Sequence, residues 1–201
     1  HDPVVLMRNT IKHLSQMTAG DLDGDGREDL IVAGRSAVAW MRNLGGGNGS
    51  FAGPQVIGAR GERDLEAVDV DGDGDVDIVG VTTGDAGATP RWKGIVFWLE
   101  NRGAGRQFVQ HDITDQILEA SGVASIPRAD GHGVDVVSTS MEDSTVALYH
   151  WTGNPNSSSS GGGSNSSSSG GSSGGSNSGT GRWVMTKLTD PRCGEPNLGA
   201  D

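Results

Sequence analysis

Two nine-residue stretches, DLDGDGRED at residues 21–29 and DVDGDGDVD at residues 69–77, carry carboxylates at alternate positions around glycines. Ca²⁺ prefers about six to eight hard oxygen ligands, and alternate side chains of a tightly turned loop can point at one centre. Each stretch therefore predicts one calcium site. We expect two structural Ca²⁺ ions as the cofactors of the chain.

The expected ligands of each site are four aspartate side chains and one backbone carbonyl. In the first loop they are Asp21, Asp23, Asp25 and Asp29, with the carbonyl of Arg27; in the second they are Asp69, Asp71, Asp73 and Asp77, with the carbonyl of Asp75. In the first loop, Gly24 and Gly26 permit backbone angles that other residues rarely adopt.

The early spacing of these loops also occurs in EF-hands, which need an acidic residue at position twelve and a helix on each side. Position twelve is Val32 in one loop and Gly80 in the other. Each loop leads directly into a β-branched apolar run, so the loops feed strands rather than helices. The remaining alternative is a solvated acidic turn without metal, which the mutual repulsion of closely spaced carboxylates disfavours.

A second pattern, Trp-x-x-Asn, recurs at Trp40, Trp98 and Trp151. The first two copies run through a glycine turn to an aromatic residue, and the third is completed by GRW at residues 181–183. Acidic loop and tryptophan pattern recur together at a period of roughly 50 to 60 residues, which is typical of propeller blades or solenoids. The predicted repeats cover about residues 14–57, 62–113 and 123–188.

Each repeat is predicted to contain one strand after the acidic loop, one that ends near the tryptophan and one after a Gly/Asn hairpin. These strands are residues 30–33, 37–42 and 55–57, then 78–81, 95–100 and 107–113, then 136–140, 145–151 and 183–188. Antiparallel meanders repeated without helices predict an all-β fold of β-propeller blades, about three of them complete.

The acidic loop of the third repeat, RADGHGVD at residues 128–135, has diverged. Arg128 stands in place of the first aspartate, His132 stands in place of the third, and one residue is missing before Asp135. We expect no calcium in this loop. Arg128 is expected to neutralise Asp130 or Asp135 where the other loops use a metal.

These loops and tryptophan patterns resemble the FG-GAP and VCBS repeats of integrin α-chain propellers, propeller lectins and many secreted proteins. The resemblance covers nearly the whole chain outside its Ser/Gly tract. It implies that the Asp-rich loop joins strands of one blade and binds structural calcium through the eight aspartates named above. It does not imply a single function.

The phase of the repeats at the two ends predicts a segment of a longer polypeptide. Residues 4–14 fall where an outer strand precedes a loop, and Asp201 falls where the first ligand of a further loop would stand. Closed propellers use about four to eight blades. The alternative is a small ring closed within the chain or assembled from several copies.

The net charge of −11 argues against nucleic acid as a partner, because phosphates call for basic surfaces. No apolar run has the length of a membrane span. Residues 155–181 form a Ser/Gly/Asn insert that is expected to be a flexible hairpin loop. Glycosylation sequons begin at Asn48, Asn156 and Asn165, and the single cysteine, Cys193, is either a free thiol or bridged to another chain.

No enzyme constellation is present in the sequence, because the five histidines are scattered and the abundant serines reflect composition. The recurring tryptophans could stack on sugars, but one per repeat at a fixed register favours a place between blades. We therefore expect a non-enzymatic, secreted or cell-surface segment for adhesion, recognition of glycans or extracellular proteins, or assembly of a surface structure. Alternatives are a subunit of a glycoprotein filament built from copies of itself and an accessory propeller of a polysaccharide-active enzyme.

Overall fold

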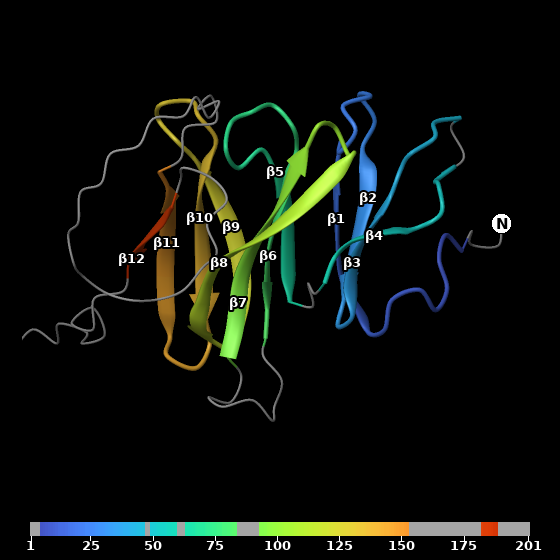
Figure 1. Cartoon of the computed structure of the whole chain (residues 1–201). Helices are drawn as coiled ribbons and strands as arrows, with labels where there is room; N and C mark the ends of the chain where they lie inside the picture. The colour runs from blue at the N-terminus through green and yellow to red at the C-terminus, as the bar shows by residue number, and fades with distance from the viewer. Residues whose placement is uncertain (1–4, 47–48, 60–62, 84–92, 153–181, 189–201) are drawn as a thin grey trace, which may run out of the picture.

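The computed structural model of the chain describes residues 5–46, 49–59, 63–83, 93–152 and 182–188. Within these ranges the strands form three antiparallel sheets of four strands each, packed side by side (Figure 1). This confirms the predicted all-β fold of blade-like sheets. Among the described residues, no helix is long and apolar enough to cross a membrane.

Each sheet is a simple meander in which strands that follow one another in the chain are also neighbours in space. The first sheet contains β1 (Leu14–Gly20), β2 (Asp29–Gly34), β3 (Ala37–Met41) and β4 (Gln55–Gly58). The second contains β5 (Asp64–Val68), β6 (Asp77–Thr82), β7 (Lys93–Arg102) and β8 (Gln107–Leu118). The third contains β9 (Ala120–Pro127), β10 (Val134–Ser140), β11 (Thr145–Trp151) and β12 (Trp183–Lys187).

The first strand of each sheet was not predicted from the sequence. β1, β5 and β9 read LSQMTAG, DLEAV and ASGVASIP, and these small or polar residues lack the β-branched runs that mark the other strands. In space, β5 contacts both β1 and β9. The strands that lead into the acidic loops therefore lie next to one another, as the innermost strands of propeller blades do.

The outer strand expected at residues 4–14 is wrong over the described residues 5–13, which form no strand. Asn9 and His13 have φ values of 58° and 52°, which interrupt an extended backbone. Ile11 is instead buried against Val32 and Ala39 on the first sheet, and Lys12 accepts a 3.0 Å backbone hydrogen bond from Arg35. This segment therefore covers a sheet face rather than extending a sheet edge.

The core lies between neighbouring sheets and includes Trp40 and Trp98 of the repeated pattern, whereas Trp151 is partly buried against it. Trp40 packs with Leu65 and Phe97 of the second sheet, and Trp98 packs with Tyr149 of the third. Trp40 and Trp98 are 7% and 2% exposed, so the prediction of a core position is confirmed for both. The β1–β2, β5–β6 and β9–β10 loops all lie along the upper edge in Figure 1.

Candidate metal sites

Three carboxylates converge in each of the two acidic loops, which connect β1 to β2 and β5 to β6. In each group, one ligand oxygen per residue lies within 4.8 Å of the others. The groups are Asp21, Asp23 and Asp29 in the first loop and Asp69, Asp71 and Asp77 in the second. Positions one, three and nine of both predicted sites are therefore brought together.

The aspartate at position nine is the anchor of each loop, and it is almost fully buried. In the first loop, Asp29 accepts hydrogen bonds from the backbone amide of Leu22 at 3.2 Å and from the indole nitrogen of Trp40 at 2.8 Å. In the second, Asp77 accepts from the backbone amides of Val70 at 3.1 Å and Asn101 at 2.7 Å. These bonds fix each carboxylate relative to its sheet.

The aspartate at position one turns each loop by accepting hydrogen bonds from amides further along it. Asp21 accepts from the backbone of Asp25 at 3.0 Å and of Gly26 at 2.7 Å. Asp69 accepts in the same way from Gly72 and Gly74. The four loop glycines all have positive φ, between 70° and 97°, which confirms the backbone angles predicted for the first loop.

Position five lies outside both convergent groups. Asp25 forms ion pairs with Arg27 and Arg42, and Asp73 accepts a 2.9 Å hydrogen bond from the backbone of Asp75. Arg27, whose carbonyl was the expected ligand, also donates through its side chain to the carbonyl of Asn43 at 3.0 Å.

Asp75 points elsewhere. Its carboxylate accepts from the backbone amides of Gly103 at 3.0 Å and Ala104 at 3.2 Å, and so closes the turn between β7 and β8. The structure therefore joins three of the four predicted side chains at each site.

The asparagine of the Trp-x-x-Asn pattern holds each loop against its sheet, a role that sequence reasoning missed. Asn43 donates to the carbonyl of Glu28 at 2.9 Å. Asn101 donates to the carbonyls of Val76 at 3.0 Å and Leu22 at 2.8 Å. This role could have been inferred from the sequence, because the asparagine recurs together with the acidic loop in the first two repeats.

The electrostatics of the clusters favour a bound cation. Burial, and to a smaller extent the neighbouring carboxylates, raise the pKa of Asp77 to about 8 and that of Asp71 to about 6. Burial and then Asp29 raise the pKa of Asp23. A divalent cation among these groups would relieve their mutual repulsion and favour their ionised form.

The buried oxygens of the loops fit a hard metal ion. Asp23 has a side chain only 10% exposed, and its Oδ1 is buried without a hydrogen-bond partner. An unsatisfied buried carboxylate oxygen is costly, and coordination to a cation would compensate that cost. Carboxylate oxygens are the ligands that Ca²⁺ prefers, whereas the clusters contain none of the thiolate or imidazole donors that favour Zn²⁺.

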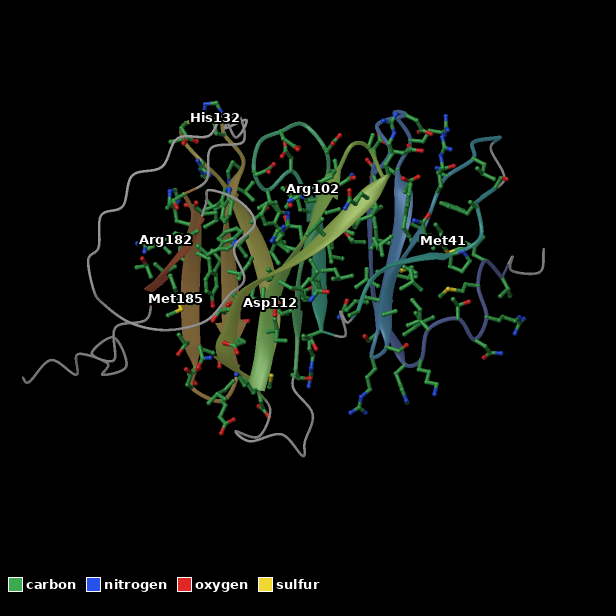
Figure 2. The ribbon with its side chains drawn as sticks, viewed as in Figure 1. Met41, Arg102, Asp112, His132, Arg182 and Met185 are labelled. Atoms are coloured by element: carbon green, nitrogen blue, oxygen red, sulfur yellow. The ribbon has the colours of Figure 1, made fainter. Side chains whose placement is uncertain are left out.

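The diverged third loop contains an arginine, Arg128, that is ion-paired within the loop. Arg128 forms a 3.0 Å ion pair with Asp130, which confirms one of the two predicted partners, whereas Asp135 pairs with His150 at 2.7 Å. In the part of the chain that the structure describes, this loop supplies no group of three convergent metal ligands. His132 of this loop lies at the same upper edge as the other loops (Figure 2).

Two histidine–carboxylate pairs were not predicted. His111 lies 2.7 Å from Glu100, and His150 lies opposite Asp135 on neighbouring strands. The alternation of side chains across the β10–β11 hairpin could have predicted the second pair. No described serine hydroxyl bonds to either histidine, so neither pair is part of a nucleophile–base–acid triad within these residues.

Several predicted features lie outside the described residues. They are the sequons at Asn48, Asn156 and Asn165, the Ser/Gly/Asn insert at residues 155–181, Cys193 and the further loop expected at Asp201. They stay predictions from the sequence.

Comparison with known proteins supports the resemblance carried by the acidic loops. Residues 21–80 match the family model of the FG-GAP-like repeat. The match begins at the first aspartate of the first loop and ends within β6, so it includes both carboxylate clusters. A search of curated proteins found no match. Residues 21–80 are therefore similar to the FG-GAP-like repeat, and they lie in an all-β chain of blade-like sheets.

Proposed function

We propose that the chain is a calcium-stabilised, non-enzymatic β-propeller module of a secreted or cell-surface protein. The observation that carries this proposal is the convergence of three aspartates at the same positions of two equivalent loops. The match to the FG-GAP-like repeat and the three four-stranded sheets support it. FG-GAP repeat domains are typically non-catalytic, which agrees with a scaffold.

The bound ion would supply positive charge to carboxylates that repel one another. Asp21, Asp23 and Asp29 would hold it in the first loop, and Asp69, Asp71 and Asp77 in the second. The loops are hydrogen-bonded to the sheets through Asn43 and Asn101. The side chain of each asparagine donates to a loop carbonyl, and its backbone amide donates to the ninth-position aspartate. Calcium would therefore fix the loop edge of the molecule.

The energetic effect of such sites suits an extracellular module. Extracellular calcium modules bind with dissociation constants of about 10⁻⁴ to 10⁻³ M. At roughly millimolar calcium, each site would then stabilise the fold by about 0.4 to 1.4 kcal/mol. Sites of this strength fill where calcium is abundant and stiffen a fold that its apolar core already forms.

Recognition of glycans or extracellular proteins is the function we propose for the stiffened module. Its support is the placement of three loops along one edge of packed sheets, since loops on a rigid scaffold commonly carry binding residues. A glycan array probed with and without Ca²⁺ tests this: calcium-dependent binding of a defined glycan supports recognition, and binding of none of the glycans leaves a protein partner or self-assembly as the role.

Thermal unfolding of the full chain tests the calcium part of the proposal. The melting temperature in about 2 mM Ca²⁺ is expected to exceed that in chelator by a few degrees, roughly 2–8 °C for two sites. Mg²⁺ at the same concentration is the matched control, because its octahedral preference fits these loops poorly. Identical melting curves in Ca²⁺ and chelator would contradict the proposal.

A further inference from the structure

The two acidic loops differ in the charges that surround them. In the first loop, Arg42 forms ion pairs with Asp23 and, at 3.2 Å, with Asp25, while Arg27 also pairs with Asp25. Among the described residues, none of the five aspartates of the second loop forms an ion pair with arginine, lysine or histidine. Arg42 is therefore ion-paired with a member of the first cluster and Arg27 with the neighbouring Asp25, whereas the aspartates of the second loop have no such ion pair among the described residues.

This difference in charge arises from residues at equivalent positions of the two repeats. Arg42 directly precedes the asparagine of the first Trp-x-x-Asn pattern, and Glu100 directly precedes that of the second. Arg27 occupies position seven of the first loop, where the second has Asp75. Both basic positions of the first site are thus acidic at the second.

Glu100 has ion-pair partners of its own, and neither of them forms an ion pair with an aspartate of the second loop, although the charge of Arg102 also interacts with Asp71. Its carboxylate pairs with Arg102 at 2.7 Å and with His111 at 2.7 Å. Arg102 lies at the end of β7, near the loop edge (Figure 2). No arginine ion pair therefore stands between an external cation and the carboxylates of the second cluster in the described residues.

We propose that the second loop binds Ca²⁺ more tightly than the first, because Arg42 acts as a built-in counter-ion that competes with the metal for Asp23. This inference rests on the calcium sites of the proposed function. Arg42 competes without blocking the site: its side chain is 47% exposed and can move into water, and Oδ1 of Asp23 has no hydrogen-bond partner. Calcium would therefore fill the second loop first.

The size of the effect follows from charge. Calcium affinity in loop sites is tuned by the number of charged ligands and by site rigidity. A single positive charge held roughly 6 Å from a divalent ion weakens its binding in water by about tenfold. We therefore expect the two dissociation constants to differ by at least about tenfold, with the smaller value at the second loop.

Isothermal titration with Ca²⁺ on the full chain tests this assignment. Asp23→Asn leaves the second site as the main binder, and Asp71→Asn leaves the first. The Asp23→Asn protein is expected to bind about tenfold more tightly than the Asp71→Asn protein. Adding Arg42→Gln to Asp71→Asn is expected to tighten binding at the first loop by about tenfold.

The matched control is Lys93→Gln in the same Asp71→Asn background. It changes the net charge equally, but Lys93 pairs with Asp115 at the opposite end of β7 from the loops. It is expected to change the affinity by less than about twofold, because exposed charges farther apart than about 10 Å are largely screened.

The outcomes separate this inference from the proposed function. Equal affinities in the two single-site proteins, or no tightening by Arg42→Gln, would overturn the inference while leaving the calcium sites in place. Absence of Ca²⁺ binding to the unmodified chain would overturn both. If a single-site variant unfolds, Arg42→Gln alone still decides, because in the intact chain it should tighten only the weaker step of the titration.

Discussion

The side-chain amide of Asn101, at the end of the second sheet's β7, donates a 2.8 Å hydrogen bond to the carbonyl of Leu22 in the first acidic loop. The backbone amide of Leu22 binds Asp29, and the backbone amide of Asn101 binds Asp77. The two carboxylate clusters, which lie in different sheets, are thus joined through Leu22 and Asn101. Asn101 is fully buried, so these bonds have no competition from water.

Replacing Asn101 should cost far more than replacing its counterpart in the first sheet. Asn101→Ala leaves two carbonyls and the amide of Gly105 without partners in a buried site, so we expect a loss of about 2–4 kcal/mol in the free energy of unfolding. Asn43→Ala, at a half-buried position, is the matched control and should cost about 1 kcal/mol. Urea denaturation measures both, and equal losses would contradict a bridging role for Asn101.

Two glycines of the third loop give a matched test of loop packing. Gly131 and Gly133 have φ values of 73° and 79°, but a Cβ on Gly131 would meet nothing within 4 Å, whereas one on Gly133 would lie 2.1 Å from the carbonyl oxygen of Val70. Gly131→Ala should cost about 1 kcal/mol from backbone strain alone.

Gly133→Ala must in addition push the third loop away from the second, at a further cost of about 1–3 kcal/mol. Because Val70 lies inside the second acidic loop, Gly133→Ala is also expected to weaken Ca²⁺ binding, and Gly131→Ala is not. Similar stability losses in the two variants, measured by denaturant titration, would argue against close loop packing.

The sequence predicted those elements whose residue types and spacing are themselves characteristic, and it did not predict elements that depend on contacts with distant strands. Strands such as β2 and β6, which are rich in β-branched residues, followed from composition, and the positions of Asp21 and Asp69 followed from ligand spacing. The inner strand β5 could not be predicted, because DLEAV owes its conformation to pairing with β6 and to its neighbours in the adjoining sheets.

The ion pairs of the first site were also outside the reach of sequence reasoning. Arg42 is separated from Asp23 by 19 positions in the chain, and only the β2–β3 hairpin brings them together. Similarly, Ile11 belongs to an apolar segment whose burial on a sheet face, rather than at an edge, depends on the positive φ of two neighbours.

The stability of the metal-free protein should fall as the pH rises. Folding raises the pKa of Asp71 to about 6 and that of Asp77 to about 8, above the value of about 3.9 for an unfolded aspartate. The folded state therefore binds more protons than the unfolded state between about pH 4 and 8, and the free energy of unfolding decreases with pH across this window.

In chelator, the melting temperature at about pH 5.5 is expected to exceed that at about pH 8 by at least roughly 3 °C. Asp77→Asn removes the group with the larger shift and should flatten the profile. Saturating Ca²⁺ should reverse the slope, because the metal binds ionised carboxylates. If the melting temperature in chelator instead rises from pH 5.5 to pH 8, ionisation of Asp71 and Asp77 does not destabilise the folded state.

Equilibrium dialysis of the full chain against about 2 mM Ca²⁺, followed by elemental analysis, is the most direct test of the calcium sites. Two ligand clusters predict close to two bound ions per chain, falling to about one in either Asp23→Asn or Asp71→Asn. A Ca²⁺ content no higher than that of a variant carrying both Asp23→Asn and Asp71→Asn would contradict the central claim that these loops are metal sites.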